Sequence, residues 1–307
     1  MNFPEDTFCI SASSLALWGK CPWLYNVTKI QKRESIRIKS GREFGSIIHK
    51  VLAYRYQNVD RLTPSELNAE QQKLLEKEFA ATEFDGDDYH NLSYATALLA
   101  RYAKEYPTDP FDVVKVDGKP VVERSLMVPL CTIDAPKLNP APINVVWTGI
   151  IDALIQWPDT TLEHLDHKTS SRGGNAFFDE FNNDVAQIGY TWALHKSGFN
   201  TSGFTINALV TPKPKVGGDI SFQFLRQRIH VDEDQLLEWE TNTINIVMEM
   251  FHTFESNCYP LHRWNCVGKY GRCDLYELCS YQQSVRPEIL KGSGFKDTKH
   301  SPIYDSL

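Results

Sequence analysis

The chain has 307 residues, of which 42% are hydrophobic, and its 32 Lys and Arg against 39 Asp and Glu leave a formal net charge of −7. This length suits one large domain, or one domain with helical additions, and the hydrophobic content is enough for a sizeable core. No run of 18 apolar residues predicts a membrane span, and the negative charge excludes indiscriminate coating of nucleic acid, though not a local binding groove.

Apolar residues at helical spacing and alternating runs together predict a mixed α/β chain. Helices are predicted at 11–21, at 41–56, twice within 64–106, at 181–196 and at 236–254. Strands are predicted at 121–130, 147–157, 161–169, 205–210 and 220–229. The last twenty or so residues are polar and contain Pro and Gly, which predicts a poorly ordered tail.

The N-terminal segment Met1–Asp6 lacks the basic start and apolar stretch of a signal peptide. We therefore expect a cytoplasmic protein with no membrane partner. In a reducing compartment, the seven cysteines are better explained as metal ligands or core residues than as disulfides.

The most informative segment is 147–169, where two strand-like runs flank the turn Pro158-Asp159-Thr160, as in a β-hairpin. Side chains alternate along a strand, so Asp166 and Lys168 share one face, about 6.6 Å apart. A short hairpin brings Asp152 opposite them. Two carboxylates and a lysine on one face can hold a divalent cation beside an ammonium group, which is chemistry suited to phosphodiester hydrolysis.

Weaker signals accompany the hairpin. His49 lies on the predicted helix 41–56, and a lone histidine on such a helix is more often packed than a ligand. Gly45, one turn earlier, would let this helix approach a sheet closely. Gln187 and Tyr190 share one face of the helix at 181–196. Glu123, in the strand before the hairpin, is interpreted as a solvent-facing residue and is left out of the predicted site.

Five features resemble the RecB-like branch of the PD-(D/E)xK nucleases, particularly the CRISPR-associated exonuclease family and its phage relatives. Their order and spacing match over nearly the whole chain, from Ser11 to Cys279. The features are Ser13-Ser14 with Lys20-Cys21-Pro22 and Tyr25; Gly41, Gly45 and His49; Gly149-Ile150-Ile151-Asp152; Asp166-His167-Lys168-Thr169; and the C-terminal cysteines.

The resemblance implies that Asp152 and Asp166 are ligands of Mg²⁺ or Mn²⁺, together with the backbone carbonyl of His167. The His167 side chain would point to the opposite face. Lys168 would orient or deprotonate the attacking water, or neutralise charge on the phosphate. His49 would be a further metal ligand, and its imidazole favours Mn²⁺.

The resemblance also assigns a glutamine and a tyrosine that support the lysine and the DNA, which here would be Gln187 and Tyr190. The family usually has three residues between them, and this chain has two. Aligning Tyr190 with the family tyrosine places Ala186 at the glutamine position.

One N-terminal and three C-terminal cysteines hold a [4Fe–4S] cluster in the RecB-like family, and here these would be Cys21, Cys266, Cys273 and Cys279. Six residues separate Cys266 from Cys273 where the family commonly has two, although phage relatives resemble the longer form. Four thiolates also suit zinc, and the nearby Cys258 and His262 leave a mixed zinc site open. Cys9 and Cys131 are better explained as buried residues than as metal ligands.

The expected fold is a restriction-endonuclease-like α/β core, with a central mixed β-sheet flanked by helices and with helical N- and C-terminal parts joined by a metal cluster. Residues 1–110 would form a helical part with Cys21 and His49. Residues 111–230 would form the nuclease core, 231–285 the C-terminal helix and Cys-rich segment, and 286–307 the tail.

The expected function is metal-dependent exonucleolytic hydrolysis of single-stranded DNA or DNA ends, in phage or prokaryotic replication, recombination or repair. A phage-encoded chain would act in the host cytoplasm, with recombination, replication or CRISPR-adaptation proteins as partners. One alternative is a structure-specific endonuclease. Another is a non-catalytic DNA-binding or interaction subunit with the same fold, against which the intact set of Asp152, Asp166 and Lys168 argues.

Overall fold

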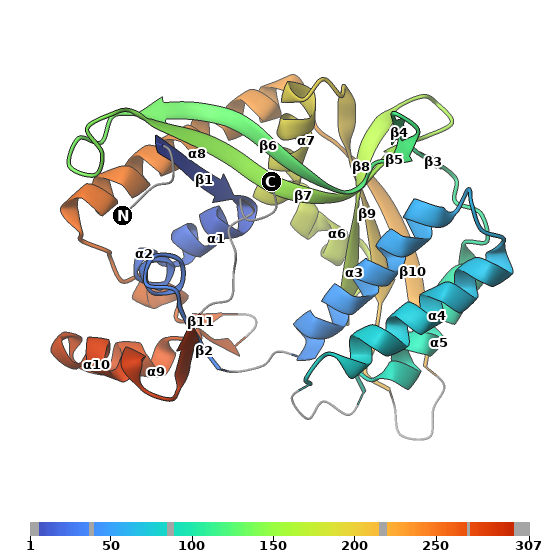
Figure 1. Cartoon of the computed structure of the whole chain (residues 1–307), viewed down its shortest axis with the longest axis horizontal. Coiled ribbons are helices and arrows are strands. Elements are labelled where there is room, and N and C mark those ends of the chain that lie inside the picture. Colours follow the sequence, from blue (N-terminus) through green and yellow to red (C-terminus); the bar gives the residue numbers. More distant parts are fainter. Residues whose placement is uncertain (1–5, 37–39, 85–88, 215–219, 269–270, 298–307) are drawn as a thin grey trace. The chain divides into compact units, whose positions relative to one another are not determined.

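The computed structural model describes residues 6–36, 40–84, 89–214, 220–268 and 271–297 (Figure 1). The end of the predicted tail, residues 298–307, lies outside the described residues. The chain forms two compact units, each assembled from separate segments. The first, called the sheet unit here, comprises Ile38–Leu126 and Gly149–Trp239, and the second, the terminal unit, comprises Met1–Arg37, Met127–Thr148 and Glu240–Leu307.

The sheet unit is built on a mixed β-sheet in which β7, β8, β9 and β10 are successive neighbours. The hairpin strands β7 and β8 are antiparallel, β8 and β9 are parallel, and β9 and β10 are antiparallel. The bounds are β3 Asp112–Val113, β6 Val122–Ile133, β7 Ile143–Gln156, β8 Leu162–Ser170, β9 Thr201–Val210 and β10 Gln223–His230. Together with the flanking helices, this arrangement confirms the predicted fold class, a mixed α/β fold with a central mixed sheet.

Helices lie on both faces of this sheet. Successive strand residues point to opposite sides, so neighbouring residues of one strand contact helices on different faces. Leu165 of β8 packs in an apolar cluster with α3, α4 and α5, which lie side by side in Figure 1. His164, the preceding residue, instead places Nε2 3.2 Å from the carbonyl oxygen of Gln187 in α7. The helix bounds are α3 Ser40–Asn58, α4 Pro64–Ala80, α5 Leu92–Glu105, α6 Asn175–Phe178 and α7 Val185–Lys196.

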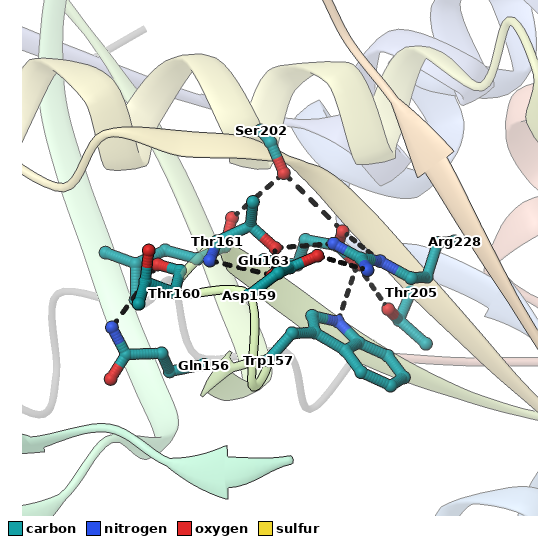
Figure 2. Close-up of polar contacts among 10 residues, drawn as sticks. Gln156, Trp157, Asp159, Thr160, Thr161, Glu163, Ser202, Thr205 and Arg228 are labelled. Atoms are coloured by element: carbon teal, nitrogen blue, oxygen red, sulfur yellow. Dashed lines mark hydrogen bonds and ion pairs between the residues drawn. The ribbon is translucent and has the colours of Figure 1, made fainter. Parts of the chain in front are cut away.

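The hairpin turn between β7 and β8 encloses a buried carboxylate, as Figure 2 shows. Asp159 Oδ1 accepts a 3.0 Å hydrogen bond from the Thr161 backbone N–H, which closes the turn. Beneath it, Glu163 is only 3% exposed and accepts hydrogen bonds from Trp157 Nε1 at 3.1 Å and Arg228 Nε at 2.7 Å. Because Arg228 also pairs with Asp159, it ties β10 to the turn.

The helix predicted at 181–196 starts later than expected, at Val185. The Asp184 side chain accepts hydrogen bonds from the backbone N–H groups of Ala186 and Gln187, so it caps the helix there. Residues 179–181 form a separate 3₁₀ turn instead. Apolar residues continue at helical spacing across the capping residue, so the sequence pattern predicted a helix start that is too early.

The terminal unit joins the two ends of the chain. β1 pairs in parallel with the beginning of β7, from Thr7↔Asn144 to Ser11↔Thr148, and β2 pairs antiparallel with β13. Neither β1 nor β2 was predicted from the sequence. The bounds are β1 Thr7–Ser11, α1 Ala12–Lys20, α2 Pro22–Tyr25, η2 Asn26–Ile30, β2 Arg33–Ser35, β11 Val267–Gly268, β12 Gly271–Arg272, α9 Tyr276–Ser280, α10 Arg286–Lys291 and β13 Phe295–Asp297.

The long helix α8, Glu233–Ser256, starts in the sheet unit and ends in the terminal unit. Among the described residues, no helix combines the length and the apolar character required to cross a membrane.

Candidate active site

The predicted metal-site carboxylates lie where the β7–β8 ladder ends. The last recorded pair is Ala153↔Leu165, so Asp152 and Asp166 occupy the next positions of the two strands. Asp152 Oδ2 accepts a 2.7 Å hydrogen bond from the backbone N–H of His167, which therefore bonds to a side chain rather than to the neighbouring strand. The end of the hairpin thus brings the two carboxylates together beside the His167 main chain.

Lys168 lies beside this carboxylate pair. Its Nζ is 2.5 Å from Asp166 Oδ2, and the lysine side chain is 34% exposed against 13% for the aspartate. Burial alone would lower the pKa of Lys168, but the charge and hydrogen bond of Asp166 outweigh burial and raise the pKa. Lys168 is therefore an ammonium group at neutral pH in this arrangement.

His49 reaches the same point from α3. Its Nδ1 lies 3.3 Å from Asp152 Oδ1, and this hydrogen bond and the charge of Asp152 raise the pKa of His49 against the opposing effect of burial. The helix is held close to the sheet at Gly45, where the Cβ of any other residue would stand 2.9 Å from Thr169 Oγ1. The same contacts hold the pKa of Asp152 well below its usual range, although burial opposes them.

An open cleft of about 550 Å³ lies over these residues. The cleft is also lined by Glu123, the second residue of β6, which was left out of the predicted site. Burial and then the negative charge of Asp152 raise the pKa of Glu123. A third carboxyl group therefore lies within electrostatic range of Asp152. The lining residues are Gly41, Arg42, Gly45, Ser46, His49, Lys50, Glu123, Ile150, Asp152, His167, Lys168 and Thr169.

Gln187 and Tyr190 lie on α7 rather than among the residues that line the cleft. The Tyr190 ring covers Gly149, where any Cβ would overlap it. Burial, followed by the charge of Asp166, raises the pKa of Tyr190 to about 12, so its hydroxyl stays neutral. Gln187 is buried, and its Oε1 has no hydrogen-bond partner within the described part of the chain.

A model of the PD-(D/E)XK nuclease superfamily matches residues 9–281. The chain belongs to the PD-(D/E)XK nuclease superfamily. None of the curated proteins compared with the chain matches it. Among solved structures, the chain is similar to one named "Putative exonuclease" from Eubacterium rectale, with 11% identity, a TM-score of 0.49, and 92% of this chain and 95% of that chain covered.

PD-(D/E)XK nucleases typically use divalent metals such as Mg²⁺, and the donors around the cleft fit such an ion chemically. Asp152, Asp166 and Glu123 offer carboxylate oxygens, which hard cations prefer, and His49 adds one nitrogen. The two aspartates are already engaged by His49, His167 and Lys168. Across the residues that the structure describes, no three His, Cys, Asp or Glu side chains are gathered closely enough to hold a metal as they stand.

The predicted cluster cysteines lie in the terminal unit. Cys21, Cys273 and Cys279 pack on one apolar cluster with Leu24 and Leu278. Burial raises the pKa of the Cys279 thiol to about 11, and proximity to the other three cysteines adds to this despite the opposing charge of Arg286. Of the alternative ligands, Cys258 is exposed and the His262 ring stacks on Trp264. All these cysteines are free thiols.

Gly149→Ala is expected to destabilise the protein by about 1–3 kcal/mol, because the added carbon overlaps the Tyr190 ring and must displace it. Chemical denaturation followed by circular dichroism measures this loss. Gly19→Ala is the matched control, since Cβ there meets no described atom within 4 Å, and its stability should not fall. Equal stability of Gly149→Ala and wild type would show that the ring is not held in this position.

Proposed function

We propose that the chain is a metal-dependent deoxyribonuclease that hydrolyses phosphodiester bonds at single-stranded DNA or DNA ends. The observation that carries the proposal is the convergence of Asp152, Asp166 and Lys168 at the end of the β7–β8 ladder. The open cleft, which Asp152 and Lys168 line, leaves room for a phosphodiester, and membership of the nuclease superfamily supplies the reaction class.

In this proposal Asp152 and Asp166 hold a Mg²⁺ or Mn²⁺ ion, and His49 adds a nitrogen ligand that favours Mn²⁺. When bound, the ion supplies Lewis acidity toward a phosphate oxygen and a water that is readily activated as a nucleophile. The protein residues hold it at the end of the hairpin. Lys168, the present partner of Asp166, would then be free to contact substrate, while the His167 amide would keep Asp152 oriented.

The His167 carbonyl is proposed as the third oxygen ligand. In an extended strand the N–H and C=O of one residue point to the same side. Because the His167 N–H is directed at Asp152, its carbonyl faces that side too, beyond the last ladder pair. The His167 ring faces α3 instead, where it stacks on Tyr56 with ring centroids 5.4 Å apart.

Lys168 is proposed to neutralise charge that develops on the phosphate, because its raised pKa keeps it an ammonium group. Tyr190 keeps its proton and can donate a hydrogen bond to DNA or to the site carboxylates. Gln187 offers an unused buried acceptor, Oε1, for the lysine once Asp166 binds a cation. These three roles complete the proposed catalytic set.

His49→Ala is expected to weaken Mn²⁺ binding by about 10- to 100-fold, because the site loses a ligand. Calorimetric titration of the DNA-free protein with Mn²⁺ measures the change. The exposed α8 residue His252, replaced by alanine, serves as the control and should bind like wild type. Unchanged affinity in His49→Ala would leave His49 a packed residue that only orients Asp152.

We further propose that the chain is of the RecB-like type, with a [4Fe–4S] cluster held by Cys21, Cys266, Cys273 and Cys279. Burial raises the pKa of the Cys273 and Cys279 thiols and so disfavours their thiolates, and a cationic centre would compensate for that effect. Zinc is the competing metal. Residues 111–230 would then carry the nuclease core, 1–110 would supply His49 and Cys21, and 231–285 the other cysteines.

The activity is tested by incubating purified protein with end-labelled linear DNA and with circular DNA, each single- and double-stranded, with Mg²⁺, Mn²⁺ or EDTA. An exonuclease degrades linear DNA, leaves circles intact and stops in EDTA. Cleaved circles favour a structure-specific endonuclease. Binding without hydrolysis favours a non-catalytic DNA-binding subunit. Either of the last two outcomes would replace the proposed exonuclease, whose setting would be phage or prokaryotic replication, recombination, repair or CRISPR adaptation.

A further inference from the structure

Three polar side chains form a row across the sheet at the level of the active site. The register pairs His167 of β8 with Asn207 of β9, and Asn207 with Arg226 of β10. Asn207 Nδ2 lies 2.8 Å from His167 Nδ1, and Arg226 Nε donates to Asn207 Oδ1 at 3.0 Å. His167 and Asn207 are almost completely buried, so water cannot substitute for these bonds.

Hydrogen-bond chemistry gives the row one direction. Arginine can only donate, so the Asn207 oxygen faces Arg226 and its amide nitrogen must donate toward His167 and the Tyr102 hydroxyl, 3.0 Å away. His167 Nδ1 is therefore an acceptor, and its ring proton sits on Nε2. That buried Nε2 has no hydrogen-bond partner among the described residues, so Asn207 provides the hydrogen bond that orients the ring.

The far end of the row is anchored by a buried ion pair. Arg226 Nη2 is 2.5 Å from Asp109 Oδ1, with side chains only 8% and 9% exposed. The same nitrogen donates to the Tyr102 hydroxyl at 2.9 Å, and the guanidinium lies 3.6 Å from the centre of the Tyr106 ring. A cation held on three sides in this way has little freedom to reorient.

The near end of the row is the main chain that anchors Asp152. His167 holds the Asp152 carboxylate through its backbone N–H, while its side chain is held by Asn207 and by stacking on Tyr56. The contacts that hold the His167 ring therefore help to hold the backbone of the same residue, whose amide fixes Asp152. The row therefore links a buried ion pair on β10 to the orientation of a carboxylate in the cleft.

We propose that Arg226 and Asn207 are positioning residues that set the affinity of the site for a divalent cation, by fixing the His167 main chain against Asp152. This inference rests on the proposed function, since it concerns the same metal site. Neither residue lines the cleft. Partners that orient metal ligands from outside typically change metal affinity by about 10- to 100-fold when they are replaced.

The test is calorimetric titration with Mn²⁺ alone, without DNA, on the full chain. Arg226→Met should bind Mn²⁺ about 10- to 100-fold more weakly than wild type. Arg226→Lys keeps the charge beside Asp109 but loses the branched guanidinium that reaches both Asn207 and Tyr102. Its Mn²⁺ affinity should therefore lie between those of wild type and Arg226→Met. DNA hydrolysis by Arg226→Met should recover when Mn²⁺ is raised above the new dissociation constant.

Arg228→Met is the matched control, because Arg228 lies two residues further along β10 and also pairs with a buried carboxylate, Glu163 (Figure 2). It should lower the melting temperature but leave Mn²⁺ affinity within about twofold of wild type. If Arg226→Met does not fold, the double variant Asp109→Leu/Arg226→Met removes both charges and should still show the weaker binding.

The outcomes separate the two proposals. Wild-type Mn²⁺ affinity in a folded Arg226→Met or double variant would overturn the positioning role while leaving the metal site intact. An equal loss of affinity in Arg228→Met would also overturn it, by showing a general effect of destabilisation. Absence of Mn²⁺ binding in the wild type would overturn the proposed metal site itself, and the positioning role with it.

Discussion

Asp166→Asn is expected to lower DNA hydrolysis by on the order of a thousandfold, because it removes a carboxylate charge from the proposed metal site and releases the partner of Lys168. The asparagine keeps the shape of the side chain, so folding should be preserved. Lys168→Met should cause a loss of similar size by removing the ammonium group from the developing phosphate charge. Single-turnover assays on end-labelled DNA with saturating Mg²⁺ or Mn²⁺ measure both changes.

Asp159→Asn is the matched control for this change. Asp159 belongs to the turn of the same hairpin, at the end of the ladder opposite Asp166, and forms an ion pair with Arg228 at 3.0 Å. Its replacement should leave hydrolysis close to wild type. Wild-type turnover in Asp166→Asn, with the melting temperature unchanged, would contradict the assignment of the active site.

Cys21→Ser is expected to release the metal centre and to lower stability by on the order of 5 kcal/mol. The reason is that a metal centre shared by Cys21 and the C-terminal cysteines closes a loop of roughly 250 residues. The wild-type protein purified without oxygen should be brown and contain about four iron and four sulfide per chain. A zinc site would instead give a colourless protein with about one Zn²⁺ and no sulfide. Metal analysis and denaturation of both proteins measure the change.

Cys131→Ser is the control for the cysteine prediction. Cys131 is a half-buried thiol of β6 whose pKa is raised by burial alone, with no contribution from the other cysteines. Its replacement should change neither metal content nor colour. A metal-free wild-type protein that is as stable as Cys21→Ser would contradict both the iron–sulfur and the zinc versions.

Local patterns were sufficient to predict the elements that present the site. The hairpin strands followed from alternation around Pro158-Asp159, and the close approach of α3 followed from Gly45 one turn before His49. These features depend on neighbours within a few residues, where strand and helix periods fix which side chains share a face. The roles of the site residues remain predictions.

Long-range pairing explains what the sequence did not reveal. His167 and Asn207 are forty positions apart and meet only through the parallel register of β8 and β9, which no local period encodes. Glu123 adopts a positive φ of 50° at the start of β6, so an alternation argument could not predict where its side chain points. β1 is short, and its partner lies more than a hundred residues later.

The amide of His167 also has a kinetic consequence. Most amide hydrogens in a sheet exchange with solvent when the ladder opens, but this one is held by a side chain, Asp152, at the point where the β7–β8 ladder has ended. Its exchange therefore depends on release of one carboxylate and not on unfolding of the strands. A cation that holds Asp152 in place against this amide would slow the exchange of this single hydrogen and leave the exchange of the rest of β8 unchanged.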